Sequence, residues 1–153
     1  MIINTKAYGR AGLIGNPSDG YFGKTISFIV RNFAAEVICY ESPQVSIIPG
    51  HRDHLVFDSR EALVEDVSLN GYYGGIRLIK ATIKAFSDYC TSTGIELEKK
   101  NFTLQYKTNV PVRVGLAGSS AIITATMRAL MAFYEVEVFK PELPNLILSV
   151  ENK

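Results

Sequence analysis

The sequence predicts an α+β domain in which helices pack on one face of a mainly antiparallel sheet. Three observations support this class: apolar residues alternate in several strand-like segments, apolar residues recur at helical spacing elsewhere, and the elements run several strands, helix, strand, helix, helix. We expect strands at residues 2–14, 24–40, 45–48 and 102–108, and helices at residues 74–93, at 119–134 and from Pro141 or Glu142 onwards.

The strand predicted at residues 24–40 changes phase part-way along its length. Apolar residues alternate over residues 26–30, and the alternation resumes out of phase at Phe33, after a slip near Arg31 and Asn32. The slip predicts a bulge or a short turn. From the periodic segments we expect a buried core that contains Ile14, Ile26, Phe28, Val30, Ile79, Ile83, Phe86, Leu104, Ile123 and Leu130.

Composition narrows the class of protein. The chain has 153 residues, of which 47% are hydrophobic, and its 16 basic and 15 acidic residues leave a net charge of +1. A balance this even argues against nucleic-acid or membrane partners, and no apolar run is long enough to cross a membrane. The N-terminus lacks the apolar core of a signal peptide. Cys39 and Cys90 show no metal spacing, which favours buried, reduced thiols in a cytoplasmic protein.

A loop of small residues, Pro111 to Ala121, is the most informative segment. Gly115 and Gly118 allow the main chain to approach an anion closely, and the helix predicted to begin near Ser119 would direct its free N–H groups at the same point. A serine in the first turn could also contribute a hydroxyl to Mg²⁺. The alternative interpretation is a plain glycine turn with a serine N-cap.

Residues 18–25 almost spell the nucleotide-binding motif GxxxxGK[ST]. Ser18 stands where the first glycine should be, two aromatic residues occupy the loop, and the residues after Thr25 alternate like a strand. A phosphate-binding loop of that class opens a helix, so we reject this interpretation.

Two further segments contain candidate site residues. In residues 9–19, Asp19 could accept hydrogen bonds from sugar hydroxyls, and Arg10 could stabilise a phosphoryl group in transfer. The residue types alone slightly favour an Asx turn at Asp19 and a solvated strand position for Arg10, and both interpretations stay open. The segment HRDH at residues 51–54 is a weak metal signal because no third ligand is evident. Tyr72 and Tyr73 could line a pocket or pack at the start of a helix.

Two motifs together resemble the GHMP kinase superfamily. The segment GRAGLIGNPSD (residues 9–19) is similar to its first motif, and PVRVGLAGSSA (residues 111–121) is similar to its second, the phosphate-binding loop. Within the superfamily the chain looks most like the glucuronokinases, which carry similar segments to those at residues 15–23, 25–27, 71–75 and 115–122. The resemblance covers essentially the whole chain.

The resemblance implies a ribosomal protein S5 domain 2-like fold and transfer of phosphate from ATP, with Mg²⁺, to the anomeric oxygen of D-glucuronate. It assigns the ATP phosphates to Gly115, Leu116, Ala117, Gly118, Ser119 and Ser120, and Mg²⁺ to Ser120 and Glu151. It assigns the transferred phosphoryl group to Arg10 and substrate hydroxyls to Asn16, Ser18 and Asp19. The partner it implies is a small sugar or sugar acid.

The chain also departs from the family pattern. Asn16 and Pro17 replace the Glu-His of galactokinases, which argues against galactose. The family's catalytic aspartate and C-terminal domain lie beyond Glu151, so residues 1–153 resemble a truncated N-terminal domain, which we expect to be nearly inactive alone. A glucuronate carboxylate needs a cation, either Arg113 or a residue of the absent part. The alternatives are a kinase for another sugar or sugar acid and a non-catalytic S5-like binding module.

Overall fold

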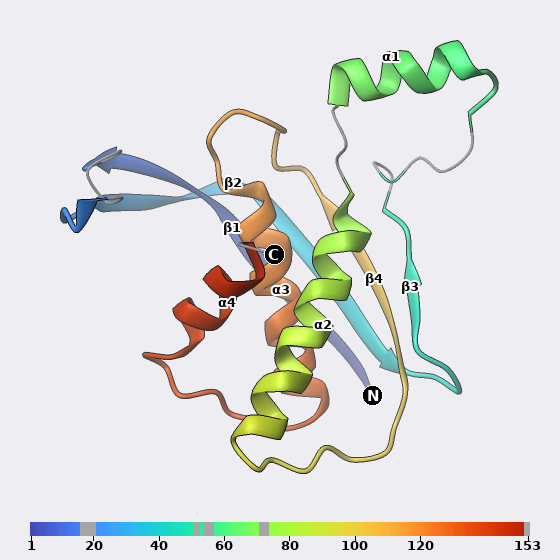
Figure 1. Ribbon diagram of the computed structural model, residues 1–153, viewed down its shortest axis with the longest axis vertical. Helices are drawn as coiled ribbons and strands as arrows, with labels where there is room; N and C mark the ends of the chain where they lie inside the picture. The colour runs from blue at the N-terminus through green and yellow to red at the C-terminus, as the bar shows by residue number, and fades with distance from the viewer. Residues whose placement is uncertain (16–20, 51–52, 54–56, 71–73, 152–153) are drawn as a thin grey trace.

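The computed structural model describes residues 1–15, 21–50, 53, 57–70 and 74–151. It confirms the predicted α+β class: helices pack on one face of a single sheet (Figure 1). The strands are β1 (Ile2–Ile14), β2 (Ile26–Glu41), β3 (Ser46–Ile48) and β4 (Phe102–Thr108), and the helices are α1 (Arg60–Asn70), α2 (Gly75–Ser92), α3 (Gly118–Phe133) and α4 (Leu143–Glu151).

The sheet has the strand order β1-β2-β4-β3 and is mainly antiparallel, as predicted. The β1–β2 and β2–β4 pairs are antiparallel, and the short edge strand β3 runs parallel to β4. Alternate residues of β2 and β4 point into the core beneath α2 and α3, where Val37 and Leu104 are fully buried. The segment after Thr25 enters β2 and not a helix, which agrees with rejecting the GxxxxGK[ST] interpretation.

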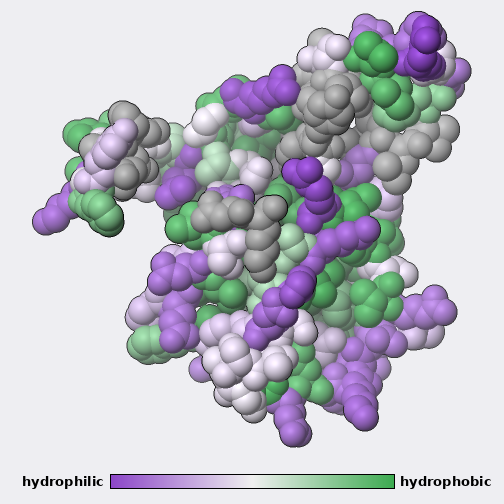
Figure 2. Space-filling view, in the orientation of Figure 1, coloured by the Kyte–Doolittle hydropathy of each residue, from purple (hydrophilic) through white to green (hydrophobic). Residues whose placement is uncertain are grey.

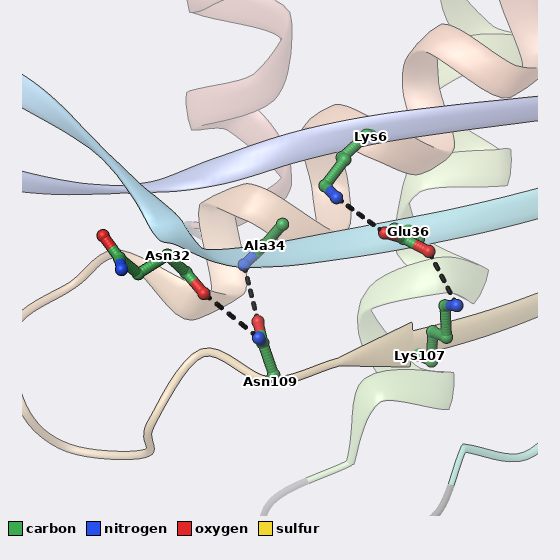
Figure 3. Close-up of polar contacts among 6 residues, drawn as sticks. All are labelled: Lys6, Asn32, Ala34, Glu36, Lys107 and Asn109. Atoms are coloured by element: carbon green, nitrogen blue, oxygen red, sulfur yellow. Dashed lines mark hydrogen bonds and ion pairs between the residues drawn. The ribbon is translucent and has the colours of Figure 1, made fainter.

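The predicted phase slip is a β-bulge. Tyr8 of β1 faces Ala34, but the next residue, Gly9, faces Val30, so residues 31–33 of β2 have no partner on β1. The Asn109 side chain binds this irregular backbone: it accepts a hydrogen bond from Ala34 N at 2.7 Å and donates one to the Asn32 carbonyl at 3.2 Å (Figure 3). Asn109 thus satisfies two backbone polar groups at the bulge, and the bulge bends the hairpin at this point.

An ion-pair network lies on the other face of the sheet. Glu36 forms 2.8 Å contacts with both Lys6 on β1 and Lys107 on β4 (Figure 3). Hydrogen bonds from Lys107 and then Lys6 hold the pKa of the Glu36 carboxyl below its ordinary value. The network therefore links three strands on a face that no helix of the described chain covers.

Burial matches the sequence expectation in the body of the protein. Ile79, Phe86, Leu104, Ile123 and Leu130 are all buried. Cys39 and Cys90 are also buried and unpaired, as expected, and burial raises the pKa of the Cys39 thiol to about 11.

Burial differs from the expectation on the outer half of the β1–β2 hairpin. Ile14, Ile26 and Phe28 are 63%, 57% and 51% exposed, while Val30 and Ile83 are half-buried. The reason is geometric: the hairpin extends past the helices, so nothing in the described chain covers its apolar side chains (Figures 1 and 2). An alternating pattern predicts a pleated strand, but its apolar side chains are buried only where another element packs over them.

Helix α1 was not predicted. It stands apart from the body, and none of its described side chains is buried (Figure 1). Its sequence has no apolar stripe at helical spacing, which is why periodicity misses it. The signal that could have found it is Ser59, whose Oγ accepts a hydrogen bond from Ala62 N at 3.1 Å in an N-cap arrangement. In the part of the chain that the structure describes, no helix is long and apolar enough to cross a membrane.

Candidate functional site

The phosphate-loop candidate lies against the free edge of β1. The backbone N–H of Arg10 donates to the Leu116 carbonyl at 3.0 Å, which extends the strand pairing by one residue of the loop. The neighbouring Gly9 allows this approach, because a Cβ there would lie 3.3 Å from the same carbonyl oxygen. The two sequence motifs are therefore joined at the backbone.

The loop turns sharply into α3. Arg113, Gly115 and Ala117 all have positive φ, at 62°, 75° and 52°, which is a strained conformation for the two that carry a Cβ. Helix α3 begins at Gly118, and its N-cap residue is Ala117. The Ala117 side chain provides no capping hydrogen bond. The interpretation of the serines as an N-cap is therefore wrong, and no side chain in the described part of the protein caps the N–H groups of the first turn.

Ser120 and Glu151 meet at this end of α3. The Ser120 hydroxyl donates a short hydrogen bond to a carboxylate oxygen of Glu151, the last residue of α4. The contact joins two positions that lie 31 residues apart in the sequence. A hydroxyl and a carboxylate beside a phosphate are oxygen ligands of the kind that Mg²⁺ takes, since it usually keeps several waters and needs only one or two carboxylates. The residues present thus fit a nucleotide-borne Mg²⁺.

Arg10 faces two cavities that open on either side of the loop. The smaller cavity, of about 120 Å³, is bounded by the loop and by polar and small residues of the hairpin: Arg10, Gly12, Ile14, Thr25, Ser27, Gly115 and Ala117. The larger cavity has a volume of about 540 Å³ and lies between β1, α3 and α4. Its polar lining residues are Tyr8, Arg10, Ser120, Thr124, Arg128, Lys140 and Glu151.

The structure brings most of the predicted site residues together. Arg10, the loop from Gly115 to Ser120, and Glu151 converge at the N-terminal end of α3. Arg113 is exposed and lines neither cavity, so it is not placed to bind a substrate carboxylate in them. Asn16, Ser18 and Asp19 lie outside the described residues, as do Tyr72 and Tyr73.

The sequence analysis missed several cavity residues. Thr25 and Ser27 contribute hydroxyls to the small cavity, and Arg128 and Lys140 contribute cations to the large one. A signal for Arg128 is present: Ser120, Thr124 and Arg128 recur at four-residue intervals in a mostly apolar helix, which places them on one face. Lys140 has no comparable signal, because only the approach of α4 to α3 brings it there.

Asp53, the described residue of the HRDH segment, accepts hydrogen bonds that hold the local structure together. One of its carboxylate oxygens accepts from Gly75 N, at the start of α2, at 2.9 Å, and the other accepts from Gly50 N at 3.0 Å and from the Tyr106 hydroxyl. The bond from Gly75 N lies at the start of α2, where an anion is favoured, and the other two tie the carboxylate to a loop and to β4. His51 and His54 lie outside the described residues, so the weak metal interpretation of this segment stays a prediction.

Comparison with known proteins shows what this arrangement resembles. Residues 77–153 match the family model of the GHMP kinases N terminal domain. Two Arabidopsis thaliana proteins, probable glucuronokinase 2 and glucuronokinase 1, are 45% and 42% identical over 99% of the chain. The chain spans 42% of the length of each of them. A solved structure of Lactococcus lactis galactokinase in complex with galactose superposes with a TM-score of 0.74 at 20% identity, over 99% of this chain and 38% of that one.

Proposed function

The chain belongs to the GHMP kinase family, and from that premise we propose that it is the N-terminal, nucleotide-binding domain of an ATP-dependent sugar 1-kinase that acts on D-glucuronate. The reaction converts ATP and D-glucuronate into ADP and glucuronate 1-phosphate: the anomeric oxygen bonds to the γ-phosphorus, the bond to the β,γ-bridging oxygen breaks, and the hydroxyl proton leaves to a base. The identity to two proteins named glucuronokinases supports the substrate.

One observation supports the nucleotide site above the others: the Ser120–Glu151 contact at the N-terminus of α3, which no described side chain caps. In the proposal, backbone N–H groups of residues 115–120 bind the ATP phosphates, because a loop with positive φ that leads into a free helix N-terminus favours anions. Ser120 and Glu151 would hold Mg²⁺, which would supply charge neutralisation at the phosphate oxygens.

Arg10 is proposed to stabilise the phosphoryl group in transfer. It lines both cavities beside the loop, and its guanidinium offers several N–H donors in a planar arrangement that suits phosphate oxygens. Phosphoryl transfer depends mostly on positioning and electrostatic stabilisation, so a fixed cation next to the phosphate loop suits the role. Asn16, Ser18 and Asp19 are proposed to bind substrate hydroxyls. A cytoplasmic location is part of the same proposal.

The function can be tested in a chimera in which residues 1–153 replace the matching segment of Arabidopsis thaliana probable glucuronokinase 2, with the unaltered plant protein as reference. We expect the chimera to form glucuronate 1-phosphate from D-glucuronate and ATP, with the product identified by ³¹P NMR, and to leave D-galactose unreacted. A chimera that melts cooperatively at the temperature of the reference but phosphorylates only neutral sugars, or no sugar, would overturn the proposal.

The 153-residue chain alone is predicted to be nearly inactive. The resemblance places the catalytic aspartate outside this sequence, and loss of a base or orienting carboxylate typically lowers a rate by about 10²–10⁴-fold. An open half-cleft also leaves water and sugar unconstrained. We expect glucuronate-dependent ADP release by the chain to fall at least that far below release by the chimera, whereas equal rates would show that the chain contains the whole catalytic apparatus.

A further inference from the structure

The small cavity beside the phosphate loop contains two hydroxyls that have no role in the proposed nucleotide site. Thr25, just before β2, and Ser27, within it, line this cavity together with Arg10 of β1. Neither hydroxyl forms a hydrogen bond with a described residue, and the Arg10 guanidinium forms no ion pair with one. Three polar side chains therefore face one cavity without a partner in the part of the chain that the structure describes.

Strand pairing brings these side chains to one face of the β1–β2 hairpin. Arg10 is paired with Ile29, and Gly12, two residues further along β1, is paired with Ser27. Because alternate residues of a strand share a face, Arg10, Ser27 and Thr25 lie on the same side of the hairpin. Two residues of a strand span about 7 Å, so Ser27 lies about that far from Arg10 along the strand direction.

The space between Arg10 and Ser27 has room for a small polar molecule. Gly12 has no side chain, so β1 itself adds nothing to this face between Arg10 and Ile14. The cavity has a volume of about 120 Å³. This volume is several times the roughly 30 Å³ that one water molecule occupies in the liquid.

The cavity lies where the acceptor of a phosphoryl transfer has to bind. Gly115 and Ala117 of the phosphate loop border it, as does Arg10, which is proposed to contact the transferred phosphoryl group. Transfer requires the attacking oxygen to lie next to the phosphorus and in line with the bond that breaks. The large cavity on the other side of the loop is lined by Ser120 and Glu151, the proposed Mg²⁺ ligands. The small cavity is therefore the better place for the acceptor.

The lining of the small cavity suits a ring that carries several hydroxyls. A serine or threonine hydroxyl donates one hydrogen bond and accepts two, as a sugar hydroxyl does. Arg10 is the one charged residue among the lining residues that the structure describes, so these contacts favour sugar hydroxyls over a carboxylate. Ile14 lines the outer end and is 63% exposed, which leaves its side chain available to the C–H face of a sugar ring.

We propose that Thr25 and Ser27 bind ring hydroxyls of the sugar acid and so hold its anomeric oxygen beside Arg10. The inference rests on the proposed function and adds two substrate-binding residues to it, both outside the motifs at residues 9–19 and 111–121. A pyranose ring with its substituents is comparable in width to the separation of about 7 Å between Arg10 and Ser27 along the strand. Because the cavity extends to Ile14, the sugar stays next to the residues that follow β1 in the sequence, to which the proposed function assigns other substrate hydroxyls.

The test uses the chimera described above with Ser27→Ala, Thr25→Val and Thr25→Ser. The matched control is Ser46→Ala, because Ser46 is an exposed serine of β3 whose hydroxyl forms no hydrogen bond with a described residue. We expect KM for D-glucuronate to rise about 3- to 10-fold in Ser27→Ala and Thr25→Val, because each loses one neutral hydrogen bond. KM for ATP should stay unchanged. Thr25→Ser keeps its hydroxyl and should match the parent, as should Ser46→Ala.

The outcomes separate this inference from the proposed function. A parent chimera that phosphorylates D-glucuronate, with Ser27→Ala and Thr25→Val equal to Ser46→Ala, overturns the subsite and leaves the kinase proposal standing. Equal rises in KM for ATP and for the sugar would assign the cavity to the nucleotide and would also overturn the subsite. A parent chimera that phosphorylates no sugar overturns the proposed function, and this inference with it.

Deoxy forms of D-glucuronate, each lacking one ring hydroxyl, test the hydrogen bond itself. The rise in KM caused by Ser27→Ala should disappear with the analogue that lacks the hydroxyl bound by Ser27, because that bond is already absent in the parent, and should persist with the others. A rise of full size with every analogue would show that Ser27 binds no ring hydroxyl. Neither Ser27 nor Thr25 has a described hydrogen-bond partner to lose, so we expect all variants to melt at the temperature of the parent.

Discussion

Leu104 in β4 and Phe28 in β2 both lie in strand segments where apolar residues recur at every second position, yet Leu104 is fully buried and Phe28 is 51% exposed. Leu104 lies under helices supplied by the same chain, whereas Phe28 lies on the outer half of a hairpin that projects past those helices (Figure 1). The comparison separates the type of element, which an apolar pattern indicates, from burial, which it does not. Periodicity indicates the type of element, and burial depends on whether another element lies over it.

The largest predicted effect is a difference in stability between these two regions. Leu104→Ala should lower the free energy of unfolding by about 2–5 kcal/mol, because it leaves a cavity in a closed core. Phe28→Ala should change it by less than about 1 kcal/mol, because the ring is half in water already. Urea unfolding of both variants decides the comparison. Equal losses would show that the outer hairpin is covered in solution, for instance by a second copy.

A smaller effect is predicted at the bulge where the two regions join. Asn109→Ala removes the acceptor for Ala34 N and the donor to the Asn32 carbonyl, and should cost about 1–3 kcal/mol because backbone groups are left unpaired. Asn101→Ala is the matched control at the other end of β4. It removes one exposed hydrogen bond to the Pro43 carbonyl. Thermal unfolding should show a larger loss for Asn109→Ala, and the reverse order would argue against the bulge as an anchor.

The smallest effect concerns the ion pairs on the uncovered face of the sheet. Because the pKa of Glu36 is lowered by Lys107 and Lys6, its stabilisation is present above the pKa of the unfolded state and is lost as the pH falls through the folded-state value. Glu36→Gln should therefore cost about 0.5–1 kcal/mol near pH 7 and nothing at strongly acidic pH. Unfolding curves of both proteins across the acidic range test the sign; a gap that is independent of pH would exclude the ion pairs as its cause.

Most of the fold was predictable from local patterns. The strands, α2, α3, α4 and the bulge after Val30 all follow from alternation or helical spacing within each segment. Helix α1 was missed because its sequence has no apolar stripe at helical spacing, and none of its described side chains is buried. Burial of Ile14, Ile26 and Phe28 was wrongly predicted, because burial depends on which elements pack over a strand in the folded protein.

The candidate site divides in the same way. Arg10, the loop from Gly115 to Ser120 and Glu151 could be named in advance because two motifs resemble a known family. Arg128 and Lys140 could not, because they lie outside those motifs and only the packing of α4 on α3 brings them into one cavity. Cavity residues of this second kind depend on tertiary neighbours, so a local pattern does not reveal them.

The most direct test of the central claim is calorimetric titration of ATP·Mg²⁺ into the 153-residue chain, with Ser120→Ala and the distant Ser87→Ala as a matched pair. The account predicts that the chain and Ser87→Ala bind alike and that Ser120→Ala binds about 10-fold more weakly, because one ligand at the phosphate end is lost. Equal affinity in both variants, or no binding by the folded chain, would contradict the loop as a phosphate site.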